Sequence, residues 1–155
     1  MRIGWTATML ACVVASTSCG SDTVTGPQSP ETTTFAASLS VDLNAMTRSA
    51  AGLYTRDLVV GTGATAVNGK TLGMHYMGYL SNGTLFDGNT SAIPFSFVIG
   101  ANTVIQGWEQ GILGMKVGGR RQLVIPPALG YGNSGIGPIP PGAVLIFTVD
   151  LLTVQ

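Results

Sequence analysis

The sequence predicts an α+β domain in which an antiparallel sheet curves around one short helix. Residues 102–116 are the only stretch after residue 52 whose apolar residues follow a clear helical spacing. The remaining apolar stretches alternate as strands do and are separated by turn residues. The 22 glycines and eight prolines of the 155-residue chain are typical of turn-rich β structure rather than a helical bundle.

The helix is expected within residues 102–116, where five apolar side chains form one stripe: Val104, Ile105, Trp108, Ile112 and Met115. Thr103 can cap its start, and the glycines from Gly114 onward end it. A helix of so few turns is not stable alone in water, so it must pack against a larger structure.

Six strands are expected around this helix: 53–60, 70–80, 84–87, 95–99, 120–125 and 144–154. The second strand places Tyr76 on one face and His75 on the other, and Asn82-Gly83 is the preferred centre of the following hairpin. The last strand alternates most clearly, and four of its side chains should face the core: Leu145, Phe147, Val149 and Leu151.

The N-terminal part of the chain has a different composition. Residues 1–18 combine a basic start, an apolar run and small residues, which is typical of an export signal peptide. Cys19 follows at once, and this resembles bacterial lipoprotein signals, in which that cysteine is acylated. Ser16 departs from the pattern, so plain secretion is the alternative. Residues 19–51 are rich in Ser, Thr and Pro and predict a flexible tether, with at most a short helix over 35–46, before a domain over 52–155.

Charge and residue inventory exclude several classes of function. Seven basic and seven acidic residues leave no basic stripe for nucleic acid. Two cysteines and one histidine provide no metal cluster, and we expect neither metal nor cofactor. His75 lacks a nucleophile on its own strand face, and nothing pairs Asp87 with Glu109. What remains is a set of aromatic residues that either fill the core or line an apolar ligand pocket.

Seven segments provide a more specific signal because they occur together and in order: 76–80, 83–87, 94–100, 104–111, 114–120, 125–132 and 139–141. They resemble the FK506-binding-protein (FKBP) family of peptidyl-prolyl cis-trans isomerases, and the resemblance covers residues 53–155. It implies a half-barrel of antiparallel strands wrapped around the helix of Trp108.

The resemblance also implies the site residues. The catalytic set is Tyr76, Phe86, Asp87, Trp108, Tyr131 and Phe147, and the substrate- or macrolide-binding set is Phe95, Val104, Ile105 and Ile139. By the same resemblance, Trp108 forms the pocket floor, while the Ile105 N–H and the Tyr131 hydroxyl hold carbonyl groups. The segment after Asp87 lacks the arginine that members often place there, so Asp87 needs another partner, such as Tyr76. The loop after Tyr131 is about one residue shorter than in other members of the family and carries Ile136 where some relatives have a histidine.

The expected function is therefore isomerisation of X–Pro bonds during the folding of exported proteins, without covalent or acid–base chemistry. The expected partners are proline-containing polypeptides, with FK506- or rapamycin-type macrolides as inhibitors. The protein should be a monomer of the cell envelope that reaches a membrane only through a lipid on Cys19. The alternative is a module that binds proline-containing clients with little turnover.

Overall fold

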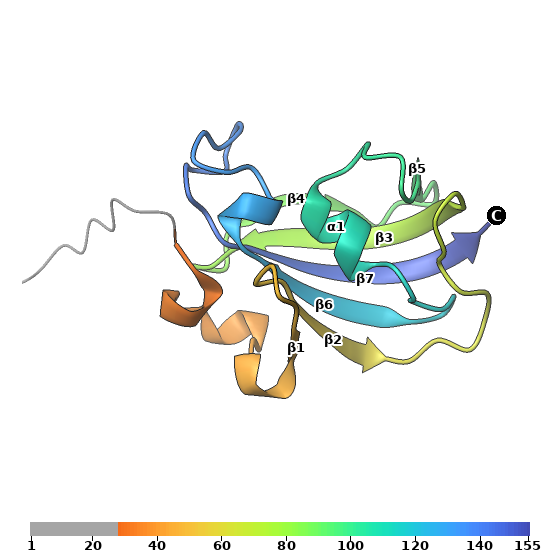
Figure 1. Ribbon diagram of the computed structural model, residues 1–155, viewed down its shortest axis with the longest axis horizontal. Coiled ribbons are helices and arrows are strands. Elements are labelled where there is room, and N and C mark those ends of the chain that lie inside the picture. Colours follow the sequence, from red (N-terminus) through yellow and green to blue (C-terminus); the bar gives the residue numbers. More distant parts are fainter. Residues whose placement is uncertain (1–27) are drawn as a thin grey trace, which may run out of the picture.

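The computed structural model describes residues 28–155, and its centre is one antiparallel sheet of seven strands (Figure 1). Their order is β1-β2-β6-β7-β3-β4, and β5 pairs with β3. The strands are β1 (Thr47–Arg48), β2 (Tyr54–Val59), β3 (Thr71–Leu80), β4 (Leu85–Asn89), β5 (Phe95–Val98), β6 (Arg120–Ile125) and β7 (Leu145–Val154). The curved sheet and the single short α-helix among residues 28–155 confirm the predicted α+β class.

The long strands β3 and β7 lie side by side in the interior of the sheet. They pair from Leu72↔Val154 to Leu80↔Leu145. The predicted inward residues of β7 lie in the main hydrophobic core, together with Trp108 and the inward side of β6. Because side chains alternate along a strand, Ile146 of β7 and Val124 of β6 face the opposite side of the sheet.

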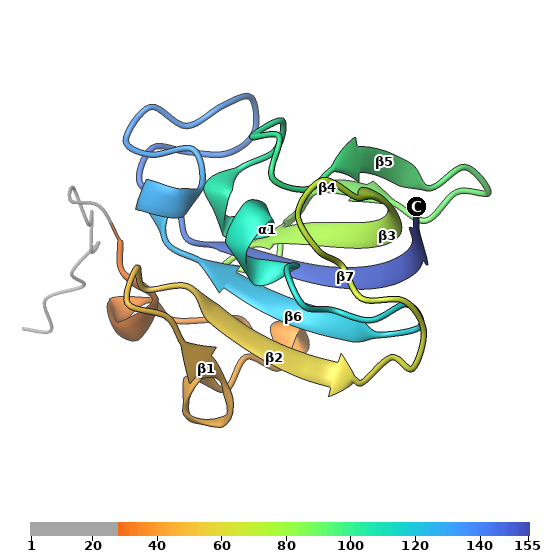
Figure 2. The ribbon, with the colours of Figure 1, turned by 45° about the vertical axis from the view of Figure 1, so that its right-hand side comes forward.

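Helix α1 (Gln106–Gly111) crosses the inner face of the sheet and is shorter than expected (Figure 2). Ile105 is its N-cap and no side chain caps it, so the predicted cap at Thr103 is wrong. Residues 103–105 remain outside the helix and line a cavity instead. A Cβ atom at Gly107 would lie 2.5 Å from Ile125 Cγ2, so this glycine allows α1 to lie directly on β6.

Residues 28–46, which we call the N-terminal strap, cover the outer face of the sheet, away from α1 (Figures 1 and 2). The strap contains three short 3₁₀ helices, η1 (Pro30–Thr32), η2 (Ala37–Leu39) and η3 (Leu43–Ala45). Leu39 joins Tyr54, Val124, Val144 and Ile146 in a second hydrophobic core.

The strap is also tied to the sheet by hydrogen bonds. The buried Gln122 side chain donates from Nε2 to the Leu39 carbonyl at 2.8 Å, and the Ala36 N–H donates to the Ser81 carbonyl at 2.8 Å. Residues 28–51 therefore differ from the flexible tether that we expected, because the outer face of β6 and β7 is apolar and requires cover. The predicted signal peptide and Cys19 lie outside the described residues. Within residues 28–155, no helix has the length and apolar character needed to cross a membrane.

Candidate functional site

A cavity of about 400 Å³ opens on the inner face of the sheet, beside α1. Its walls come from β3, β4, β5, β7, the segment before α1 and the turn after η4 (Pro127–Leu129). The lining residues are Tyr76, Phe86, Asp87, Phe95, Asn102, Thr103, Val104, Ile105, Trp108, Tyr131 and Phe147. Apart from Ile139, every residue predicted for the pocket lines this cavity. Sequence reasoning missed Asn102 as a lining residue and treated Thr103 only as a helix cap.

Trp108 forms the floor of the cavity and is held there by the edges of other rings. Its indole meets Tyr76 at 5.0 Å between ring centroids, Phe147 at 5.3 Å and Phe95 at 5.9 Å, with interplanar angles of 81–84°. This edge-to-face arrangement is the favourable one for aromatic pairs. The indole Nε1–H is buried and has no hydrogen-bond partner among the described residues. The ring contacts, rather than a hydrogen bond, therefore hold the indole in place.

Gly78 on β3 makes room for two of these rings. A Cβ atom at this position would lie 2.6 Å from Phe147 Cε1 and 2.8 Å from Phe86 Cζ. Because glycine has no Cβ atom, the rings of Phe86 and Phe147 can form a T-shaped pair with 5.5 Å between their centroids. Both rings line the cavity.

Tyr76 and Asp87 form the main polar contact of the cavity. The Tyr76 hydroxyl donates to Asp87 Oδ2 at 2.8 Å, and the Gly88 N–H donates to Asp87 Oδ1 at 2.8 Å. Tyr76 is thus the partner that the sequence suggested for Asp87. Burial, followed by the hydrogen bond and charge of Asp87, raises the pKa of Tyr76 to about 12. Burial and the same charge also raise the pKa of Tyr131. Both hydroxyls therefore remain protonated donors at neutral pH.

Glu109 supports the wall that residues 100–105 form beside α1. Its side chain is buried, and its Oε2 accepts a hydrogen bond from the Gly100 N–H at 2.6 Å. Farther along this wall, Gln106 Nε2 donates to Asn102 Oδ1 at 2.9 Å. The Ile105 carbonyl accepts from the Trp108 N–H at 2.9 Å, whereas the Ile105 N–H donates to no described backbone carbonyl. Ile105 itself lines the cavity.

Comparison with known proteins agrees with this geometry. Residues 63–152 match the family model for FKBP-type peptidyl-prolyl cis-trans isomerases. The chain is also 49% identical over 105 residues to the FK506-binding protein of Neisseria meningitidis serogroup B, covering 66% of this chain and 96% of the relative. This chain belongs to the FKBP-type peptidyl-prolyl cis-trans isomerase family.

Larger FKBP relatives and solved structures extend the comparison. The chain is 50% identical over 105 residues to FK506-binding protein 4 of Rhizopus delemar, which covers 67% of this chain but 28% of that relative. It thus spans about a quarter of this relative's length, as it does for the similar protein of Dictyostelium discoideum, of which 28% is covered. The crystal structure of AtFKBP13 superimposes with a TM-score of 0.67 at 40% identity, covering 71% of this chain and 98% of that one. The crystal structure of FkpA from Escherichia coli superimposes with a TM-score of 0.66 at 38% identity, covering 72% of this chain and 52% of that one.

One residue of the predicted substrate- or macrolide-binding set, Ile139, lies outside this FKBP pocket. Ile139, which the resemblance placed in a loop flanking the pocket, exposes only 6% of its surface, packs in the main core and is not among the residues that line the cavity. Reciprocal backbone hydrogen bonds with Ile136, at 2.9 and 3.0 Å, form a tight turn that buries Ile139 and leaves Ile136 exposed. His75 lies on the opposite strand face from Tyr76, as predicted, and its Nε2 is 2.8 Å from the Ser91 carbonyl.

Proposed function

We propose that this protein catalyses cis–trans isomerisation of X–Pro peptide bonds in polypeptides. The observation that carries the proposal is the apolar cavity on Trp108, with hydrogen-bond donors at its edge. Its size and its few convergent polar groups are those of a small-ligand site, which suits a prolyl ring with its flanking peptide groups.

The chemistry requires a shaped, apolar site rather than a reactive group. Rotation about a peptide bond crosses a barrier of about 18–20 kcal/mol, because conjugation is lost when the amide twists. The twisted amide is less polar than the planar one, so the rings around Trp108 favour it relative to water. Lowering the barrier by roughly 4–7 kcal/mol would accelerate rotation about a thousand- to a hundred-thousandfold.

Two hydrogen-bond donors and one carboxylate would orient the substrate while its central bond turns. The Ile105 N–H and the Tyr131 hydroxyl would hold the carbonyls that flank the prolyl ring. Asp87, itself held by Tyr76, would place a negative charge beside the rotating amide. The raised pKa values of Tyr76 and Tyr131 keep both hydroxyls protonated at neutral pH. In the cycle we propose they act as hydrogen-bond donors, and no proton is transferred.

We further propose that FK506- and rapamycin-type macrolides occupy the same cavity and inhibit the enzyme. The relatives that the chain resembles are named FK506-binding proteins, and the ring-lined cavity provides the same kind of surface here. A bound macrolide would cover Trp108, so its binding should change the tryptophan fluorescence.

We place the enzyme in the cell envelope as a monomer that assists exported proteins. Residues 1–18 carry the features of an export signal, and Cys19 stands where lipoproteins are acylated. A lipoprotein carries several acyl chains, and more than one is needed for stable membrane attachment.

An isomerisation assay on a proline-containing peptide tests the proposed activity. Tyr131→Phe removes one donor to the substrate and should lower kcat/KM by about two- to tenfold, the range for one hydrogen bond. Tyr79→Phe is the matched control, because Tyr79 packs against the outer core beneath the strap. A folded protein that binds the peptide without accelerating its isomerisation would refute catalysis and favour a binding module.

A further inference from the structure

The start of the N-terminal strap is bonded to the base of the loop that follows Tyr131. The Gln28 N–H donates to the Gly142 carbonyl at 3.2 Å, and the Gly142 N–H donates to the Gly132 carbonyl at 2.9 Å. The Gly132 N–H donates in turn to the Pro127 carbonyl at 2.9 Å. The first two hydrogen bonds connect the strap to Gly132, the residue next to Tyr131, and the third continues to Pro127 at the start of η4.

The same two segments also border a shared groove. Gln28 and Ser29 of the strap line a cavity of about 330 Å³ together with Pro126, Pro127, Ala128, Gly132 and Asn133. The strap therefore lies beside both η4 and the turn that carries Tyr131, although the functional cavity is on the other side of that turn.

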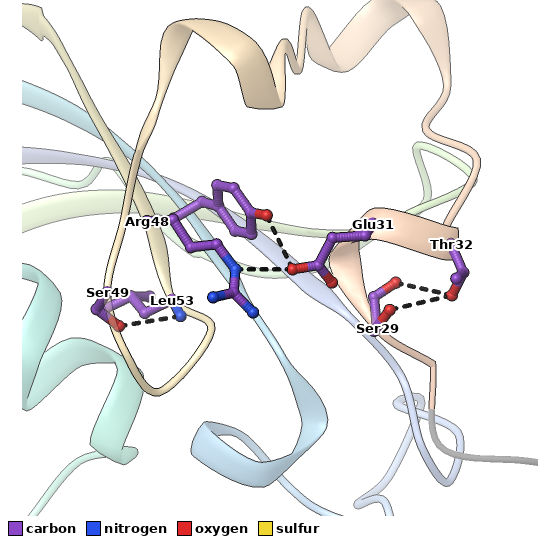
Figure 3. A network of polar contacts seen from close by, with 7 residues as sticks. Ser29, Glu31, Thr32, Arg48, Ser49 and Leu53 are labelled. Atoms are coloured by element: carbon purple, nitrogen blue, oxygen red, sulfur yellow. Dashed lines mark hydrogen bonds and ion pairs between the residues drawn. The ribbon is translucent and has the colours of Figure 1, made fainter.

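A polar clamp fixes this end of the strap to the sheet. Glu31 Oε1 accepts hydrogen bonds from Arg48 Nε and from the Tyr54 hydroxyl, both at 2.8 Å. Figure 3 shows Glu31 of η1 pointing toward Arg48, beside the Ser29–Thr32 contact. Tyr54 of β2 is buried in the second core, so the clamp connects η1 to a well-packed residue of the sheet.

We propose that the N-terminal strap is a positioning element of the prolyl-binding pocket: through Gly142 it holds the turn that places the Tyr131 hydroxyl. This inference rests on the proposed function. It concerns residues before position 63, where the match to the family model begins. A donor that shifts by a fraction of an ångström binds a carbonyl less well, so a loosened turn should weaken substrate binding more than it slows rotation.

A pair of substitutions at Gln28 isolates the first hydrogen bond in the full-length protein. Gln28→Pro removes the N–H that reaches Gly142, whereas Gln28→Ala retains it. In the proline variant KM should rise by about two- to fivefold with kcat nearly unchanged, which is the lower range for one hydrogen bond. The alanine variant should match the wild type.

A second pair tests the clamp. Glu31→Ala removes both contacts at η1 and should raise KM in the same way. Asp150→Ala is the matched control, because it removes the exposed ion pair with Arg120, at 2.6 Å, that lies away from the strap. An unchanged KM in both Gln28→Pro and Glu31→Ala would overturn the inference, even if their melting temperatures fall.

Amide hydrogen exchange separates this inference from the proposed activity. Gln28→Pro should speed exchange at the Gly142 and Gly132 amides, and Gln28→Ala should not. If the wild type does not isomerise the peptide, the proposed function fails, and exchange at these amides alone decides whether the strap holds the turn. Equal exchange in all variants would show that it does not.

Discussion

The packing of the strap predicts a large loss of stability from one substitution, Leu39→Ala. Leu39 exposes only 8% of its surface and lies on Val124, Val144 and Ile146, which are almost fully buried. A buried Leu→Ala change costs about 2–5 kcal/mol from lost burial and the cavity that remains. The strap is at the surface and can partly collapse, so we expect about 2–3 kcal/mol.

Urea unfolding followed by circular dichroism measures this change as a lower midpoint with little change in slope. For a folded part of this size the melting temperature should fall by roughly 8–12 °C, since about 1 kcal/mol corresponds to about 4 °C. Leu113→Ala is the matched control, because Leu113 is 43% exposed. Equal losses in the two variants would refute the packing of the strap on the sheet.

Three further predictions follow from the pocket, the clamp and the N-terminus. Isomerase activity should be nearly constant between about pH 6 and 8, because Tyr76 and Tyr131 have raised pKa values and stay protonated. The His75→Gln variant should retain this activity. A sharp inflection in the pH profile that disappears in His75→Gln would contradict this mechanism. The hydrogen bonds of Glu31 with its backbone, Tyr54 and Arg48 lower its pKa from 4.5 to about 2, so its stabilisation is complete above pH 4.5 and declines as the pH falls toward 2. Urea unfolding should therefore show a difference in the free energy of unfolding between wild type and Glu31→Gln that shrinks in acid. The difference should be small, because the side chains of Glu31 and Arg48 are 41% and 52% exposed. A difference that does not change with pH would argue against the clamp. Cys19→Ser should move the protein from the membrane to the soluble fraction of a bacterial host, whereas a soluble wild type would exclude lipidation.

The sequence by itself determined six of the seven strands of the described sheet, the position of the helix and nearly all of the pocket, but not β1. Alternation along residues 144–154 indicated which side chains of β7 face the core, because a strand has only two faces. The ordered motifs around Tyr76, Trp108 and Tyr131 identified the residues that line the cavity. The alternation is a local signal that can be read from neighbouring residues, whereas the pocket residues followed from the resemblance of these motifs to the FKBP family.

Only the tertiary structure decided the features that depend on distant contacts. The composition of residues 19–51 predicted a flexible tether, yet Leu39 packs on a sheet whose Gln122 is 83 residues away in the sequence. Ile139 turns into the core because of its reciprocal bonds with Ile136, although its motif placed it at the pocket. The helix starts only at Gln106 because residues 103–105 line the cavity. In each case long-range packing or loop geometry outweighs a local preference, and such energies do not appear in composition or periodicity.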